Sequence, residues 1–136
     1  MQQQTISWQQ LEQEVQAVQQ FLLQQGIQKG DCIAGYLPNI PQAISCFLAV
    51  NSIGAVWTCC SPDFGEPTVI ERFSQIQPKL LIAVDGYRYG GKAFNRMEAV
   101  QNIRAAIPSI QQTIFIPYLE VSNRLDTSVD LSLIHI

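Results

Sequence analysis

The sequence predicts an α/β fold in which a parallel sheet of βαβ units is flanked by helices. Short runs that are apolar on both faces alternate along the chain with stretches whose apolar residues recur every three or four positions. The first pattern is typical of strands buried on both faces, and the second is typical of amphipathic helices. Strands that alternate with helices in this way form parallel sheets with right-handed crossovers. A chain of 136 residues, 47% of them apolar, is also large enough to bury a core.

The first element expected is an amphipathic helix over residues 8–25. Ser7 is a suitable N-cap, Gln10 completes a capping box, and Gly26 is placed to end the helix in a left-handed conformation. The apolar stripe of this helix consists of Leu11, Val15, Val18 and Leu22. Twelve of the 18 glutamines lie at or before position 28, which is also compatible with a low-complexity tract. Because the stripe continues through the glutamines, we expect them on the solvent face of an ordinary helix.

The remaining elements follow from apolar runs that are bounded by glycine or proline. Strands are expected at residues 32–37, 55–60, 80–84 and 113–117. Helices are expected at residues 40–53, 67–77 and 95–107. The side chains expected to face the core are Ile44, Phe47 and Leu48 in the first of these helices, Val69, Ile70, Phe73 and Ile76 in the next, and Met97, Val100, Ile103 and Ile107 in the last.

Charge and hydropathy exclude several classes of protein. A net charge of −3 and a pI near 4.9 argue against nucleic-acid binding, which needs a basic face. No apolar run approaches the 18 residues of a membrane span, so no membrane partner is expected. The first residues have neither the basic stretch nor the apolar core of a signal peptide.

The four cysteines predict no metal centre and no catalytic thiol. Cys32, Cys46, Cys59 and Cys60 form no C-x-x-C motif, and the single histidine is His135, so zinc is not expected. A catalytic cysteine needs a neighbouring base, and no suitable histidine is available. Because all four lie in apolar runs, we expect buried free thiols in a reducing, cytoplasmic environment.

Candidate chemistry lies in the loops after the strands, because open parallel sheets bind ligands at the carboxyl ends of their strands. Residues 85–92 combine two cations, two tyrosines and three glycines. Arginine and lysine suit phosphate, tyrosine faces can stack on a base, and glycine lets the backbone approach a ligand. A phosphate-bearing nucleotide is one interpretation of this segment, and a glycine turn whose aromatic side chains lean on the core is the other.

The other loops give weaker signals. Asp63, in the loop at residues 61–65, is expected to cap a turn or helix rather than to act as an acid or base. The sequence contains no dinucleotide-binding fingerprint, no Walker-type phosphate loop and no nucleophile elbow. These absences leave the loop at residues 85–92 as the most informative segment.

Several segments together resemble one enzyme family. They are G-Y-L-P-N-I-P at residues 35–41, C-S-P-D-F-G at residues 60–65, R-F with Q-I at residues 72–76, and A-V-D-G-Y-R-Y-G-G-K at residues 83–92. These motifs are similar to those of the acetoacetyl-CoA synthetases, which form part of the acyl-CoA synthetase branch of the adenylate-forming superfamily. The entry into the first helix, from Ile6 to Leu11, is also similar to that of the superfamily, and the resemblance extends over residues 5–118.

The resemblance implies an AMP-forming acid–thiol ligase that acts in the cytoplasm. Such a ligase activates acetoacetate with ATP and Mg²⁺, passes the acyl group to coenzyme A, and releases AMP and diphosphate. It also implies that residues 1–122 are a partial N-terminal domain, with a partial sheet from the first subdomain, and that residues 123–136 are a divergent or truncated tail. The family's phosphate loop, nucleotide motifs and adenylation lysine have no counterpart here, so we expect no catalytic residue, no bound cofactor and no activity from this chain alone.

The resemblance assigns one binding role. In related synthetases, an arginine-rich turn at this place contacts the nucleotide end of coenzyme A. Arg88 matches the first arginine of that turn, and Lys92 lies near the second, with its register shifted by an extra glycine. Arg88, Gly91 and Lys92 are therefore the expected coenzyme A contacts. A free-standing nucleotide- or coenzyme A-binding module and a non-catalytic interaction domain remain the alternatives.

Overall fold

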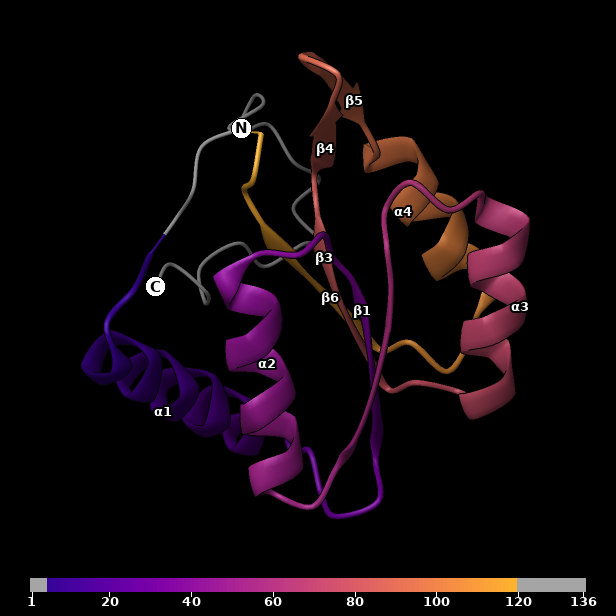
Figure 1. Ribbon diagram of the computed structural model, residues 1–136. Coiled ribbons are helices and arrows are strands. Elements are labelled where there is room, and N and C mark those ends of the chain that lie inside the picture. Colours follow the sequence, from indigo (N-terminus) through magenta and orange to yellow (C-terminus); the bar gives the residue numbers. More distant parts are fainter. Residues whose placement is uncertain (1–4, 120–136) are drawn as a thin grey trace.

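The computed structural model describes residues 5–119 and has the predicted α/β architecture (Figure 1). The four helices are α1 (Trp8–Gln24), α2 (Pro41–Ser52), α3 (Glu66–Ile76) and α4 (Met97–Ala106). The strands are β1 (Cys32–Tyr36), β2 (Val56–Cys60), β3 (Leu80–Val84), β4 (Gly86–Tyr89), β5 (Lys92–Asn95) and β6 (Gln112–Ile116). The predicted bounds of the helices and of β1, β2, β3 and β6 agree with these to within about two residues. The expected tail at residues 123–136 lies outside the described residues.

The central sheet is parallel throughout and has the strand order β2-β1-β3-β6. Helices α1 and α2 cover one face of this sheet, and α3 and α4 cover the other (Figure 1). Strand β3 shows why: its five residues are all buried and alternate between the two cores, with Leu80, Ile82 and Val84 on one side and Leu81 and Ala83 on the other. A strand that is apolar on both faces therefore fits only between two helical layers.

Helix α1 begins and ends as the sequence predicts. The Ser7 hydroxyl accepts a hydrogen bond from the backbone N–H of Gln10 at 3.0 Å, and the Gln10 side-chain oxygen accepts one from the Ser7 N–H at 2.8 Å. At the other end Gly26 has φ +80°, and the Ile27 N–H donates to the Leu22 carbonyl at 3.1 Å. This 6→1 bond together with a left-handed glycine is a Schellman motif.

A buried polar contact joins α1 to α2. The hydroxyl of Ser45, which is fully buried, donates to a carboxylate oxygen of Glu14 at 2.7 Å. Glu14 is only 6% exposed. Because a buried carboxylate without a donor is costly, this bond fixes how the two helices face each other.

Helix α2 packs with a different face from the one predicted. The spacing predicts Ile44, Phe47 and Leu48 in the core, but their side chains are 50%, 46% and 39% exposed. The buried face instead carries small side chains: Ser45, Cys46, Ala49 and Val50. The helix is apolar over most of its circumference, so the spacing of its residues does not select a face, and small residues allow it to approach α1 and the sheet closely. Within residues 5–119, no helix is long and apolar enough to cross a membrane.

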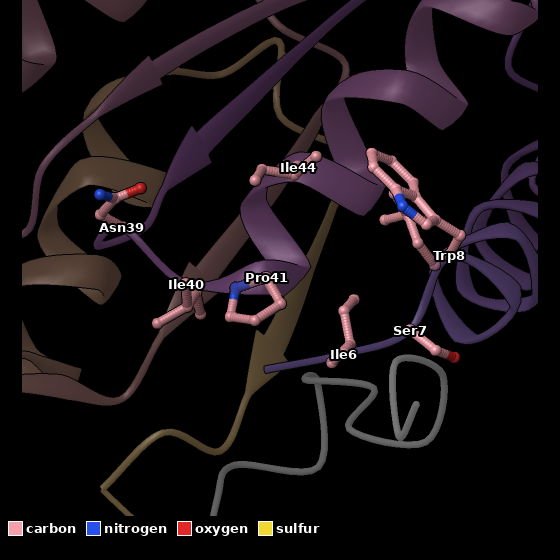
Figure 2. Close-up of a pocket in the computed structure, with 8 residues that line it drawn as sticks. Ile6, Ser7, Trp8, Asn39, Ile40, Pro41 and Ile44 are labelled. Atoms are coloured by element: carbon pink, nitrogen blue, oxygen red, sulfur yellow. The ribbon is translucent and has the colours of Figure 1, made fainter. Parts of the chain in front are cut away.

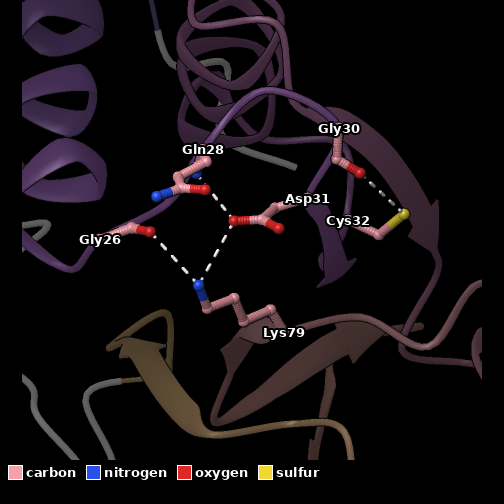
Figure 3. A network of polar contacts seen from close by, with 6 residues as sticks. All are labelled: Gly26, Gln28, Gly30, Asp31, Cys32 and Lys79. Carbon is pink, nitrogen blue, oxygen red and sulfur yellow. Dashed lines mark hydrogen bonds and ion pairs between the residues drawn. The ribbon is translucent and has the colours of Figure 1, made fainter.

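A polar network closes the amino edge of the sheet (Figure 3). The Lys79 ammonium group donates to the Gly26 carbonyl at 3.2 Å and lies 3.4 Å from an Asp31 carboxylate oxygen. The same oxygen accepts from the backbone N–H of Gln28 at 2.7 Å. This N–H bond and then the lysine lower the pKa of Asp31, although partial burial opposes them. The network ties the α1–β1 turn to the start of β3.

Candidate functional site

The topology places the candidate site at the carboxyl edge of the sheet, where β1 and β3 lie side by side. From β1 the chain crosses to β2 on one side, and from β3 it crosses to β6 on the other, so the two connections diverge between the central strands. Ligands of open α/β sheets bind at such a switch point. The loops that meet at this edge are residues 37–40, 61–65 and 85–96.

A buried tyrosine forms a hydrogen bond with the backbone of the loop at residues 61–65. Tyr36 ends β1 with no exposed surface, and its hydroxyl donates to the Pro62 carbonyl at 2.9 Å. Burial, the largest effect, raises the pKa of Tyr36 to about 12. The hydroxyl therefore keeps its proton and remains a donor at any physiological pH.

The aspartate of this loop does not cap α3. The helix has Gly65 at its N-cap, with no side-chain capping bond, and Asp63 is exposed. The Arg72 guanidinium instead lies over the Phe64 ring, 5.4 Å from its centroid. This stacking and the Tyr36 bond give the loop its shape.

Residues 86–95 form a β-hairpin, which is not among the elements expected from the sequence. Strands β4 and β5 pair antiparallel, with Tyr87 opposite Phe94 and Tyr89 opposite Lys92. Gly90 and Gly91 form the two-residue turn with φ of +59° and +78°. Positive φ at both central residues is what a type I′ turn requires, and it matches the twist of a tight hairpin. In Figure 1 the hairpin stands at the top, beyond the carboxyl ends of the sheet strands.

The hairpin places the predicted coenzyme A contacts at its exposed end. Arg88, Gly91 and Lys92 are all exposed. Arg88 pairs with Ala93, one position away from the Tyr89–Lys92 pair, so Arg88 and Lys92 lie on opposite faces of the ribbon. Because the two side chains lie on opposite faces, they cannot bind the same phosphate group together.

The two tyrosines of the hairpin differ in their surroundings. Tyr87 is half-buried and stacks on Phe94, with ring centroids 5.0 Å apart. Tyr89 is 77% exposed at the turn. Tyr87 thus fits the interpretation in which an aromatic side chain packs within the fold, and Tyr89 is the tyrosine available to a ligand.

A residue that sequence reasoning missed, Arg96, holds the base of the hairpin. Its Nε–H donates to the Pro62 carbonyl at 3.0 Å, and an Nη2–H donates to the Tyr87 hydroxyl at 3.2 Å. The guanidinium also lies 5.2 Å from the centroid of the Tyr87 ring. These partners are nine and 34 positions away in the sequence, so no local pattern reveals them.

Asp85 joins the hairpin to the segment after β6. This buried carboxylate accepts from the backbone N–H groups of Tyr118 and Leu119 at 3.0 and 2.8 Å, and the Asp85 carbonyl accepts from the Arg96 N–H at 2.8 Å. A Cβ at the next residue, Gly86, would collide with the Phe94 carbonyl and the Leu119 side chain. The base of the hairpin is therefore closely packed, whereas its turn is open.

A groove of about 410 Å³ lies between the first turns of α1 and α2 (Figure 2). Its walls are mainly apolar: Ile6, Trp8, Leu11, Ile40, Pro41 and Ile44, with Ser7 and Asn39 as polar members. The Ser7 hydroxyl already caps α1, and among residues 5–119 no cation lines the groove. The groove thus differs from the hairpin, whose exposed Arg88 and Lys92 are the cations expected to bind phosphate.

The cysteines are less buried than predicted. All four are free, but Cys59 is exposed and Cys32 is partly exposed, whereas Cys46 and Cys60 are buried. Strand β2, which carries Cys59, lies at the edge of the sheet and is covered less well than β1 or β3. Burial raises the pKa of Cys46 to about 12, so this thiol stays protonated and unreactive. Among residues 5–119, no three His, Cys, Asp or Glu side chains come together as a metal site.

Comparisons with known proteins agree on one family. The AMP-binding enzyme family matches residues 1–131. Acetoacetyl-CoA synthetase of Macaca fascicularis is 40% identical over 123 residues, and acetoacetyl-coenzyme A synthetase of Rhizobium meliloti (strain 1021) is 43% identical over 126 residues. These alignments cover 90% and 92% of this chain but only 18% and 19% of the relatives' own lengths.

The solved structure of acetoacetyl-CoA synthetase from Streptomyces lividans is similar in fold as well as in sequence. It superposes with a TM-score of 0.88 at 40% identity, over 93% of this chain and 19% of that structure. The chain thus spans about a fifth of the length of the proteins that it matches.

Proposed function

Because the chain belongs to the AMP-binding enzyme family, we propose that it is the N-terminal part of an AMP-forming acetoacetate–CoA ligase. The similarity to acetoacetyl-CoA synthetases, at about 40% identity over nine-tenths of the chain and with a matching fold, carries this proposal. The complete enzyme would adenylate acetoacetate with ATP, transfer the acyl group to coenzyme A, and release AMP and diphosphate in the cytoplasm. Mg²⁺ would enter with ATP as part of the substrate.

Within that enzyme, the β4–β5 hairpin would contribute to coenzyme A binding through Arg88. The exposed guanidinium stands at the carboxyl edge of the sheet, which is where this class of fold binds its ligands. A planar guanidinium suits a phosphate oxygen pair, and the open backbone at Gly91 lets a ligand approach the turn. Lys92, on the other face, would add a weaker and less directional attraction.

A chimera tests this role in a complete enzyme. Residues 5–119 of this chain would replace the matching segment of the Streptomyces lividans synthetase, and Arg88→Ala would be compared with the unsubstituted chimera. A charged hydrogen bond contributes about 1.5–3 kcal/mol, so the KM for coenzyme A should rise roughly tenfold to a hundredfold. Acetoacetate-dependent ATP–diphosphate exchange should stay nearly unchanged, because adenylation precedes the use of coenzyme A.

Two further variants serve as comparisons for Arg88→Ala. Lys92→Ala should raise the KM for coenzyme A less than Arg88→Ala does, and Lys29→Ala, which removes an exposed cation at the opposite edge of the sheet, should not change it. Loss of the exchange reaction in Arg88→Ala would show that Arg88 serves ATP or the fold, and would refute the coenzyme A contact.

A further inference from the structure

The orientation of the hairpin depends on contacts at its base. Strands β4 and β5 form a sheet of their own, separate from the four-stranded sheet. The ladder between them fixes the hairpin internally but does not fix its angle to the rest of the molecule. Isolated two-stranded ribbons are marginally stable, so side-chain contacts with neighbouring segments are needed to hold this one in place.

Arg96 supplies such contacts from a position between two segments of the carboxyl edge. Its Nε–H binds the Pro62 carbonyl, which also accepts the Tyr36 hydroxyl, and its Nη2–H binds the Tyr87 hydroxyl. The planar guanidinium thus connects the buried end of β1, through one shared carbonyl, to the first strand of the hairpin. Its position over the Tyr87 ring adds a cation–π attraction.

The contact at Tyr87 bears directly on Arg88, which is the next residue. Successive side chains of a strand point to opposite faces, so a fixed Tyr87 ring also fixes the face on which Arg88 lies. The Tyr87 side chain accepts a hydrogen bond from Arg96 and stacks on the Phe94 ring. The Phe94 ring lies on β5 and moves with the hairpin, so rotation of the hairpin about its base would have to break the Arg96 contacts with Tyr87.

We propose that Arg96 is a positioning residue that fixes the β4–β5 hairpin against the Pro62 loop and thereby sets the orientation in which Arg88 meets coenzyme A. The link to coenzyme A rests on the proposed function above. The structural link between Arg96 and the hairpin does not, and it is measured separately.

Hydrogen–deuterium exchange in the chimeric enzyme measures the structural link. Arg96→Ala should increase exchange over residues 86–95 by about tenfold, while the β1 and β3 segments keep their protection. Lys29→Ala is the control, because it removes an exposed cation at the opposite edge of the sheet, away from the hairpin and from the loop at residues 61–65. Equal exchange over residues 86–95 in Arg96→Ala and the unsubstituted chimera would overturn the proposal.

Steady-state kinetics measures how the Arg96 substitution changes the KM for coenzyme A. Arg96→Ala should raise the KM for coenzyme A by about threefold to tenfold and leave ATP–diphosphate exchange unchanged. Arg96→Lys, which keeps the charge but loses the planar fork, should recover only part of the affinity. A general loss of fold would lower both half-reactions, and that result would overturn the positioning role.

A double-mutant cycle tests the route through Tyr87. Tyr87→Phe removes the hydroxyl but keeps the ring and its stacking, so alone it should raise the KM for coenzyme A less than Arg96→Ala does. In the Arg96→Ala background it should add almost nothing, because the bond that it removes is already lost. If the two substitutions raise the KM for coenzyme A additively, Arg96 does not act through Tyr87. If Arg88→Ala leaves the KM unchanged, the coenzyme A contact is refuted, and increased exchange in Arg96→Ala still supports the positioning role.

Discussion

At the scale of single residues, the edges of the sheet are held by a few polar side chains that each join distant segments. Asp31 binds the Gln28 N–H and Lys79 at the amino edge, and Arg96 joins Pro62 to Tyr87 at the carboxyl edge. Each group satisfies backbone atoms at which regular secondary structure ends. The apolar layers determine the architecture, and these residues determine how the connecting segments lie.

The Asp31 network predicts a specific dependence of stability on pH. Because the pKa of Asp31 is lower in the folded chain than its ordinary value of 3.8, its contribution is present above that value and is lost as the pH falls below it. Asp31→Asn should therefore lower the free energy of unfolding by about 1 kcal/mol near neutral pH. The difference between variant and parent should stay constant from about pH 7 to about pH 5 and shrink as the pH falls through and below 3.8.

Urea unfolding at several pH values measures this difference. Glu12→Gln, which removes an exposed carboxylate on α1, is the control and should show little difference at any pH. A deficit in Asp31→Asn that stays constant down to the acid end would contradict the assignment.

The contact residues also show where sequence reasoning stops. The Ser7–Gln10 box and the Gly26 cap are local, and the sequence predicts both correctly. Arg96 has no such signature, since its partners become neighbours only after β1, β3 and the hairpin are in place. A cation between Asn95 and Met97 is indistinguishable in the sequence from a solvated surface residue.

At the scale of elements, the buried strands were predictable and the orientation of α2 was not. Residues 80–84 are apolar at every position, and only a strand between two helical layers suits such a run. Helix α2 carries apolar residues on several faces, so two packings satisfy its pattern. In the packing that forms, Ser45 binds Glu14 and the small side chain of Ala49 is buried.

Ser45 therefore has a testable role between α1 and α2. Ser45→Ala should leave the buried Glu14 carboxylate without its donor and lower the free energy of unfolding by about 1–3 kcal/mol. Glu14→Gln in the same background should recover part of this loss, because a neutral amide costs less to bury.

Thermal unfolding of the two variants followed by circular dichroism provides the measurement. Ser74→Ala, at an exposed position of α3, is the control and should change the melting temperature little. A Ser45→Ala variant as stable as the parent would mean that the bond is not needed for helix packing.

The sequence around Gly90 and Gly91 supports two different structural interpretations. Gly90-Gly91 between Tyr89 and Lys92 is a recognisable two-residue hairpin turn. The same glycines, beside two cations, also favour a flexible phosphate-binding loop, and this second interpretation led to the missed strands. The location at the carboxyl edge was correctly predicted, because it depends on topology and not on the form of the segment.

At the scale of the whole molecule, the described residues form a four-stranded parallel sheet and a separate two-stranded hairpin. We predict that the 136-residue chain alone forms no AMP from acetoacetate, ATP, Mg²⁺ and coenzyme A. Catalysis of this kind depends on groups that position the triphosphate and the carboxylate together, and the chain spans only about a fifth of its relatives. AMP release is the assay, with the Streptomyces lividans enzyme as positive control, and turnover by pure chain would contradict the prediction.

The exposed apolar face of α2 predicts self-association of the isolated chain. Ile44, Phe47 and Leu48 lie together on the outer side of this helix, and the sheet has open edges at β2 and β6 within the described part of the chain. Apolar patches and unpaired edges of this kind promote association. Sedimentation at increasing protein concentration should show oligomers, and Phe47→Gln should reduce them.

An exposed aromatic residue elsewhere provides the comparison. Tyr89→Gln removes a side chain that is 77% exposed but lies on the hairpin, so it should leave association unchanged. Equal effects of the two substitutions would attribute association to general hydropathy and not to the α2 face.

The separation of the hairpin from the main sheet has a consequence for how such a protein can diverge. Strand β3 runs directly into β4, yet the ladder of the sheet ends at Val84 and a new ladder begins at Gly86. Residues can be inserted or replaced around Gly90 and Gly91 without shifting the register of any sheet strand. The sequence of the hairpin turn can thus evolve independently of the sheet, while substitutions at Gly86, Tyr87 or Arg96 would affect the hairpin and its attachment to the sheet at once.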